Sequence, residues 1–308
     1  MIVAPSRRIT GLMIRVFGRA LCVLLAWDFA VVVCYQVLHW TWVGVSAVPL
    51  AAFGTVIGII VGFRNGSAYG RWWEARTLWG AIVNRSRTFA RQVLTTMSPE
   101  LPATPAEQTA IAAAQRDLVI HQIAYVHALR QQLRGLDPVP VVAPLVPEED
   151  PEEMARDKNV ALRIQTRMSA MLVDARRRGW LDELQWQAAD NSLSALMDAQ
   201  GGAERIKNTP MPKQFDFFPR LFVQTYCLFL PFGMVESLGW FTPLGSTLVG
   251  FMFLALERIG RDLEDPFENR IHDVSMTAIA TTIEINLRQL LGEAELPAPA
   301  KPVEGVLW

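Results

Sequence analysis

The sequence has little of what most catalytic and redox sites require. Its 308 residues include three cysteines and four histidines, and each cysteine lies inside an apolar run, where a thiol usually behaves as a small hydrophobic group. His121 and His127 are six residues apart, so they lie on different faces of a helix, unlike the four-residue spacing of zinc pairs. The sequence contains no phosphate-binding glycine loop and no nucleophile elbow. We therefore expect no enzymatic activity, no metal site and no cofactor.

The sequence also lacks an excess of charge of either sign. Its 29 basic and 30 acidic residues give a formal net charge of -1, so no basic field attracts nucleic acid. Charged residues make up only 19% of the chain and hydrophobic residues 51%, an apolar bias for a soluble protein. This composition favours a membrane protein, and because the chain shows no alternating strand pattern we expect an all-α fold.

Four apolar stretches are long enough, or nearly so, to cross a hydrocarbon core, which needs about 20 helical residues. They are Ala20–Leu38, Val43–Phe63, Phe217–Val235 and Phe241–Leu256. Arginines precede the first stretch and follow the second and fourth, whereas the connections "HWTWVG" and "ESLGW" carry no Lys or Arg. The positive-inside rule then places both termini and the long middle segment in the cytoplasm. We expect a multi-pass protein of the inner (plasma) membrane.

This pattern divides the chain into four parts. They are an N-terminal segment with two spans (1–63), a cytoplasmic helical region (64–216), the third and fourth spans (217–256), and a C-terminal cytoplasmic helix and tail (257–308). Caps and apolar spacing predict helices from Thr104 to Gly135, from Val160 to Gly179, from Asp182 to Ala199 and from Ser275 to Leu291. The stretch "VPVVAPLVPEEDPEE" is expected to be a proline-rich linker, and "ELPAPAKPVEGVLW" is too rich in proline for a helix.

Asp28 is an acidic residue within the first predicted span. A carboxylate there is costly. It is either an ion or proton site, or a side chain turned toward protein or water and paired with an arginine.

Glycine recurs at every fourth position of the second span and beyond it. These residues are Gly54, Gly58, Gly62, Gly66 and Gly70. A glycine inside a helix costs about 0.5 to 1 kcal/mol relative to alanine, and small residues at this spacing let membrane helices approach closely. We expect this stripe to pack against neighbouring helices around a pore.

A second stripe lies one residue further round the same helix. It holds Thr55, Ile59 and Phe63, also at intervals of four. Several copies of this helix around an axis would line a narrow apolar tube, which can gate by losing its water. No proline follows Phe63 until Pro99, so the helix is expected to continue out of the bilayer.

Several motifs carry a family resemblance. "FRNGSAYGRWWEARTLWG" resembles the bestrophin signature that follows the pore helix, and "GAERIKNTPMP" and "LEDPFENRIHDV" resemble segments before the third span and after the fourth. The resemblance implies a ring-shaped homopentameric ion channel with four transmembrane helices per subunit, a helical cytoplasmic region and one central pore. Its partners would be other copies of the chain, the lipid bilayer and the permeating ions.

The resemblance also assigns roles to residues. It places the three hydrophobic neck positions of the family on Thr55, Ile59 and Phe63, and the cytoplasmic aperture near "GWLDELQW", at Leu181 or Leu184. The calcium-binding acidic cluster of animal members is reduced here to Asp262 and Asp265 before the Pro-Phe pair and Glu268 and Asp273 after it. These are few oxygens for a six- to eight-ligand site. We expect Glu264, Asp265 and Asp273 to cap helices or to pair with Arg258, Arg261 or Arg270.

Ion selectivity is the least determined property. Animal bestrophins pass chloride, whereas a bacterial relative can prefer monovalent cations. The acidic run Glu148, Glu149, Asp150, Glu152 and Glu153 would favour cations if it faced the inner vestibule. We therefore predict a cation-permeable channel, with an anion channel of the same architecture as the alternative.

Two other functions fit some of these features. Asp28 and Pro231 could mark the broken-helix site of a secondary transporter, and the glycine stripe could serve packing alone in a scaffold that does not conduct. The family resemblance implies that the C-terminal tail crosses neighbouring subunits, which would make Trp308 an anchor.

Overall fold

The computed structural model describes residues 1–4, 7–99 and 104–308, and these residues are helical with no β-strand. The α-helices are α1 (Arg7–Gln36), α2 (Ala47–Thr96), α3 (Pro105–Leu133), α4 (Val139–Val142), α5 (Pro151–Arg156), α6 (Val160–Arg177), α7 (Glu183–Asn208), α8 (Lys213–Leu238), α9 (Thr242–Glu264) and α10 (Met276–Leu290). Two short 3₁₀ helices, η1 (Thr41–Val43) and η2 (Gly239–Phe241), lie between α1 and α2 and between α8 and α9.

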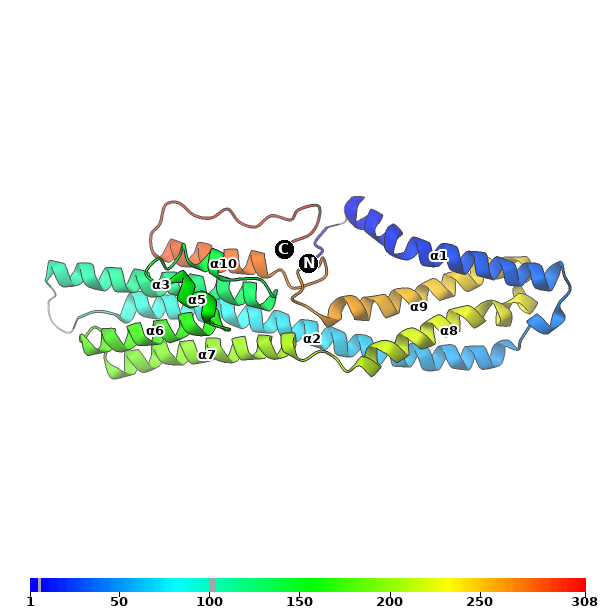
Figure 1. Cartoon of the computed structure of the whole chain (residues 1–308), viewed down its shortest axis with the longest axis horizontal. Helices are drawn as coiled ribbons and strands as arrows, with labels where there is room; N and C mark the ends of the chain where they lie inside the picture. Colours follow the sequence, from blue (N-terminus) through cyan, green and yellow to red (C-terminus); the bar gives the residue numbers. More distant parts are fainter. Residues whose placement is uncertain (5–6, 100–103) are drawn as a thin grey trace.

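Helix α2 is the axis of the molecule and joins its two halves (Figure 1). It has 50 residues, which corresponds to about 75 Å at 1.5 Å per residue. The Ser46 hydroxyl accepts a hydrogen bond from the Val48 N–H at its start, and the helix has ended before Pro99. Because no proline interrupts the stretch between, the predicted continuation of the second span beyond Phe63 is confirmed.

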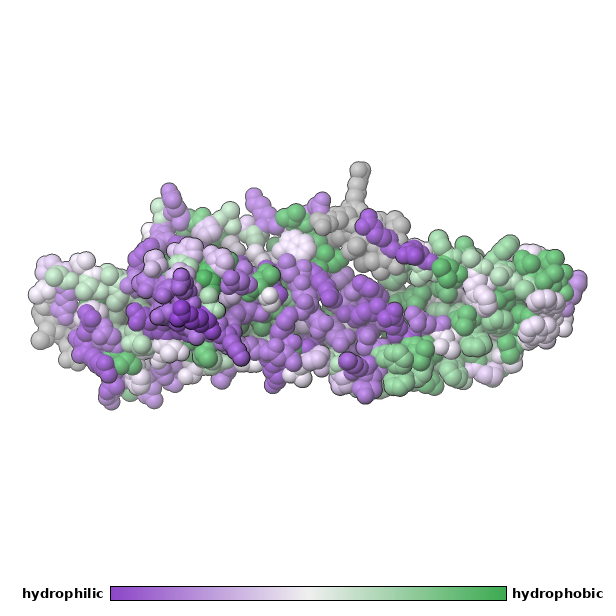
Figure 2. Space-filling view, viewed as in Figure 1, coloured by the Kyte–Doolittle hydropathy of each residue, from purple (hydrophilic) through white to green (hydrophobic). Residues whose placement is uncertain are grey.

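The apolar half consists of α1, α8, α9 and the first part of α2 (Figure 1). Three stretches of the described residues are long and apolar enough to cross a membrane, namely Phe17–Gln36, Thr41–Thr96 and Lys213–Glu264. The third contains α8 and α9, which form an antiparallel hairpin around η2. On the face shown in Figure 2, the surface of this half is largely hydrophobic, whereas the rest of the molecule is largely hydrophilic.

The bundle half consists of α3, α6, α7, α10 and the second part of α2, with the main hydrophobic core between them. Helices α3, α6 and α10 begin and end within about two residues of the predicted positions. The Thr104 side chain accepts from the Glu107 N–H, and Asp182 and Gln185 form a reciprocal capping box at the start of α7. Gly135 and Gly179 have positive φ values of 68° and 74° just after α3 and α6, a conformation that favours glycine.

Two predictions about the bundle half need correction. Helix α7 continues to Asn208, nine residues beyond Ala199, because its glycine pair does not break it. A Cβ at Gly202 would lie only 2.9 Å from Leu78 Cδ2 of α2, so glycine permits a close helix crossing there. The proline-rich segment after α3 also forms two short helices, α4 and α5, instead of an unstructured linker.

The two termini lie together between the halves (Figure 1). The Met1 amino group donates to the Leu307 carbonyl at 2.6 Å, and the Ala278 N–H at the start of α10 donates to the Trp308 carbonyl at 2.7 Å. The tail after α10 is non-helical, as its prolines predict. Within the subunit, Trp308 thus contacts its own chain.

Candidate functional site

The predicted neck residues form an uncovered column on α2. Thr55, Ile59 and Phe63 are all exposed, Ile59 by 54% and Phe63 by 73%. The Thr55 hydroxyl donates to the Ala51 carbonyl of the same helix at 3.0 Å. The column extends about 12 Å along the helix. An exposed row of large apolar side chains is typical of a surface that contacts a partner or lines a lumen.

The other side of α2 is packed. Ile57 and Val61 are buried by 98% or more against Val223, Cys227 and Leu230 of α8. This cluster fixes the rotation of α2, so the neck column points away from α8 and α9. The stripe therefore owes its exposure to the packing of the opposite face.

The five glycines do not share one environment. A Cβ at Gly54 would lie 2.5 Å from the Tyr226 hydroxyl and 2.9 Å from its Cζ, so Gly54 permits a close contact with α8 inside the subunit. A Cβ at Gly58, Gly62, Gly66 or Gly70 would meet nothing within 4 Å. These four glycines line open space in the subunit, and their role between subunits stays a prediction.

The structure gives the two candidates for the cytoplasmic aperture different environments. Leu181 is 4% exposed and belongs to the core of the bundle half, whereas Leu184 is 77% exposed in the first turn of α7. The Ser98 N–H donates to the Trp180 carbonyl at 2.9 Å, which places this turn beside the far end of α2. Of the two, only Leu184 is exposed in the subunit, and its place at an aperture stays a prediction.

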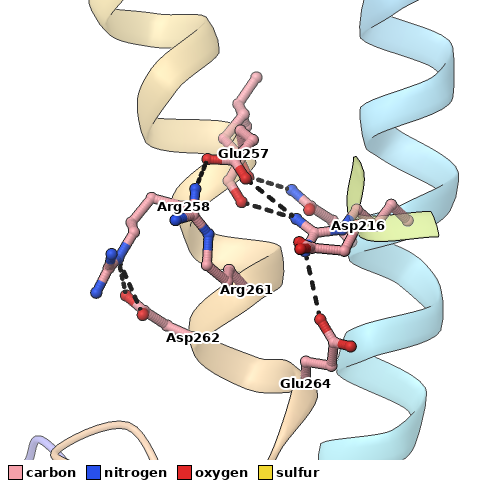
Figure 3. A network of polar contacts seen from close by, with 9 residues as sticks. Asp216, Glu257, Arg258, Arg261, Asp262 and Glu264 are labelled. Carbon is pink, nitrogen blue, oxygen red and sulfur yellow. Dashed lines mark hydrogen bonds and ion pairs between the residues drawn. The ribbon is translucent and has the colours of Figure 1, made fainter. Parts of the chain in front are cut away.

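A buried arginine joins three helices at the position directly after Phe63. The sequence patterns did not single it out. Arg64 of α2 is 1% exposed. Its guanidinium donates to Asp216 Oδ1 of α8 at 2.6 Å, to Glu264 Oε2 of α9 at 3.3 Å and to the Glu257 carbonyl at 3.0 Å. Figure 3 shows Asp216, Glu257 and Glu264 converging beside α2, with Arg261 also paired to Glu257. We call Arg64 and these three acidic residues the junction cluster.

A second arginine extends this junction to the bundle half. Arg71 donates to the Glu264 carbonyl of α9 at 2.7 Å, to the Thr209 carbonyl after α7 at 2.6 Å, and to the Ile206 carbonyl. These oxygens end helices and lack intrahelical partners, so a cation there satisfies the ends of α7 and α9. The sequence did carry a signal for Arg64, because it continues the buried stripe of Ile57 and Val61 at helical spacing.

Asp28 has partners other than the predicted arginine. It is fully buried on α1 and accepts hydrogen bonds from Ser246 at 3.1 Å and from Thr247 at 2.8 Å, both on α9. Among the described residues no cation pairs with it. Two hydroxyl donors on the adjoining helix satisfy the carboxyl group locally, so the pairing with arginine was wrong, although the side chain does face protein.

The acidic residues in the last turn of α9 and in the loop after it contact basic groups and backbone. Asp262 pairs with Arg258 at 3.0 Å and lies 3.5 Å from the His272 ring, and Glu268 pairs with Lys207. Asp273 is buried and accepts from the Arg270 N–H at 2.9 Å. In the described residues no three acidic, histidine or cysteine side chains are grouped as metal ligands would be. Arg64 is a partner of Glu264 that the sequence did not predict.

The acidic run on which the cation preference rested is partly paired with arginines. Arg163 of α6 contacts Glu149 at 3.0 Å, Glu153 at 3.1 Å and Asp157 at 2.9 Å, and Arg167 lies 3.4 Å from Glu149. The three carboxylates raise the pKa of Arg163 above its usual value. Glu148 lies 3.2 Å from the His121 ring. The field of this run is thus partly neutralised within the subunit.

Comparisons with known proteins cover nearly the whole chain. The family described as Bacterial/Fungal Bestrophin protein matches residues 7–289, so the chain belongs to the bestrophin family. The "Voltage-dependent anion channel-forming protein YneE" of Escherichia coli O157:H7 is 33% identical over 281 residues, which cover 91% of this chain and 88% of that protein. The "Voltage-dependent anion channel-forming protein RSc3414" of Ralstonia nicotianae is 34% identical over 261 residues, 84% of this chain and 82% of the relative.

The fold is also similar to a solved structure. The crystal structure of a bacterial bestrophin homolog from Klebsiella pneumoniae matches with a TM-score of 0.82 at 29% identity and covers 89% of this chain and 98% of that one. The resemblance stated from the motifs around "GRWW" is therefore confirmed, together with the all-helical fold.

Proposed function

We propose that this protein is a passive ion channel of the bestrophin type, in which five copies of α2 surround one central pore. The observation that carries the proposal is the column of Thr55, Ile59 and Phe63, which is uncovered while the opposite face of the same helix is packed. Family membership and the channel-forming relatives support it. The ring would cover the open glycines and turn the column inward.

In this arrangement the neck is a hydrophobic gate. Rings of Ile59 and Phe63 would exclude water and ions until the passage widens, because a narrow apolar tube dewets. Four membrane-spanning helices per subunit, α1, α8, α9 and the first part of α2, would hold the neck in the plasma membrane. Both termini would lie in the cytoplasm with the bundle half, and their contact with each other supports a common side.

Ion flux into proteoliposomes tests this function. Ile59→Ala and Phe63→Ala should raise passive, non-saturating flux, and a barrier lower by about 1.4 kcal/mol would raise it about tenfold. The matched control is Val56→Ala, because Val56 is 55% exposed on the same helix but off the column. Unchanged flux in both neck variants would contradict the hydrophobic gate. Saturable flux would indicate a transporter, and the absence of flux would indicate a scaffold.

For the permeating ion, we place anions ahead of the predicted cations. Two relatives are named as anion channel-forming proteins, and Arg163 and Arg167 pair with part of the acidic run on which the cation preference depended. The neck itself carries no charge. The reversal potential in asymmetric NaCl decides between the two, because it takes opposite signs for chloride and sodium selectivity.

A further inference from the structure

A cavity opens between α1, α9 and the loop that follows α9. Its volume is about 440 Å³, within the range of small-molecule sites. One end is apolar, formed by Phe17 of α1 and by Phe251, Ala255 and Ile259 of α9. Phe17 and Phe251 are in edge-to-face contact, with ring centroids 5.5 Å apart. Nothing in the proposed conduction pathway uses this cavity, which lies away from the neck column.

The other end of the cavity is polar and has more basic than acidic side chains. Arg258, Asp262, Arg270 and His272 line it. Asp262 is already paired with Arg258 at 3.0 Å, so the carboxylate and this guanidinium neutralise each other. The Arg270 side chain is exposed, and among the described residues no carboxylate forms an ion pair with it. The Asp273 carboxyl interacts with Arg270 only electrostatically. The cavity thus joins an apolar wall to an exposed guanidinium that forms no direct ion pair among the described residues.

The position of the cavity along α9 indicates which chemical class of ligand could bind there. Its apolar wall belongs to the stretch that is apolar enough to cross a membrane, and its polar end lies at the level where α9 gives way to the loop. Ile259 is 51% exposed and Met252 57%, so this side of α9 presents apolar surface to its surroundings. An occupant must therefore be apolar toward the bilayer and anionic toward the cytoplasm.

We propose that this cavity binds one anionic phospholipid of the cytoplasmic leaflet. The phosphate lies at Arg270, and one acyl chain runs along Phe17, Phe251 and Ala255. The inference rests on the proposed membrane orientation, in which the loop after α9 faces the cytoplasm. Anionic lipids are attracted to basic residues at that surface by about 1 kcal/mol per charge, or about fivefold in affinity.

Native mass spectrometry of the purified assembly, titrated with phosphatidylglycerol or phosphatidylcholine, tests the proposal. Phosphatidylglycerol should bind more tightly than phosphatidylcholine. Arg270→Gln should weaken phosphatidylglycerol about fivefold, and Ala255→Trp should abolish tight binding by filling the cavity. The matched controls are Arg220→Gln, an exposed arginine of α8, and Met252→Trp, an exposed residue of α9 outside the cavity; both should bind as the unmodified chain does.

Three results would overturn the site. They are equal binding of the two lipids, equal loss in Arg270→Gln and Arg220→Gln, and displacement of phosphatidylglycerol by glycerol 3-phosphate, which would indicate a soluble phosphate ligand. Flux assays on the same preparations separate this inference from the channel function. Normal passive flux together with equal binding of the two lipids would contradict only the lipid site. Lipid binding that depends on Arg270, together with no passive flux, would contradict only the channel function.

Discussion

Arg64 connects α2 to both α8 and α9 through its guanidinium. It is buried with Glu257, whose side chain is 5% exposed, and reaches two further carboxylates. Removing one partner of a buried ion pair is costly, because the other charge stays desolvated. The junction cluster therefore holds the packed side of the neck helix where the apolar half meets the bundle half.

Arg64→Met should lower the stability of the protein by about 3 kcal/mol, the low end of the usual range because Arg261 still pairs with Glu257. The measurement is the thermal unfolding midpoint in detergent. Arg64→Met combined with Glu257→Leu should recover part of the loss, since it removes a buried carboxylate that has lost one of its two basic partners. If the single variant unfolds at the temperature of the exposed control Arg220→Met, the cluster has no such role.

Asp273, in the loop after α9, makes the stability of the protein depend on pH. Burial raises the pKa of this carboxyl from 3.8 to about 6, despite the hydrogen bond from the Arg270 N–H and the nearby positive charges of Arg270 and the Met1 amino group. Glu268 adds to the increase, and Arg134 of α3 interacts electrostatically with the same carboxylate. The folded protein therefore binds a proton that the unfolded chain has already released between these two pH values.

The sign of the effect follows from the raised pKa. The contribution of Asp273 to stability is complete below pH 3.8 and is lost as the pH rises through about 6. Asp273→Asn keeps an oxygen acceptor for the Arg270 N–H, so the variant should gain stability relative to the unmodified chain as the pH rises from 4 to 7. Thermal unfolding across this range measures it, with the exposed Asp174→Asn as control. Parallel pH profiles for both variants and the parent would refute the assignment.

Among the helices, α2 shows how one stripe of glycines can serve two contacts. Gly54 lies against the rigid ring of Tyr226 on α8, whereas Gly58 lies in open space one turn later. Close approach of α2 and α8 depends on the first glycine and not on the second. The two positions thus form a matched pair within a single helix.

Gly54→Ala should destabilise the protein by about 1 to 3 kcal/mol, because the added methyl group forces Tyr226 and α8 away. Gly58→Ala should leave the packing of the subunit unchanged. Thermal unfolding of both variants in a detergent that keeps subunits separate gives the comparison. Equal midpoints would show that α8 shifts without cost and that the Tyr226 contact is unimportant.

The complete subunit leaves an apolar column and four glycines of α2 uncovered, and the proposed ring is what would cover them. Gly62→Leu places a large side chain where the subunit has free space. It should therefore leave the subunit folded while separating neighbouring copies, so that light scattering detects species smaller than the pentamer. Val56→Leu, on another part of the same helix, is the control. An intact pentamer with Gly62→Leu would remove this glycine from the interface.

Local sequence determined most of the helices of this protein. The caps Thr104 and Asp182, the terminating glycines and the apolar spacing act within a few residues, so they are readable without the fold. The column of Thr55, Ile59 and Phe63 was predicted for the same reason, since helical periodicity alone places those side chains on one face. The family motifs added the class of protein.

Only the tertiary structure decided which of these side chains are covered. Arg64 appeared to be one more interfacial arginine, but its partners lie 152 to 200 residues away in the sequence. Leu181 and Leu184 were indistinguishable until the core enclosed the first and left the second exposed. Spacing along one helix fixes which way a side chain points, whereas burial and ion pairing depend on helices that the chain brings together only when it folds.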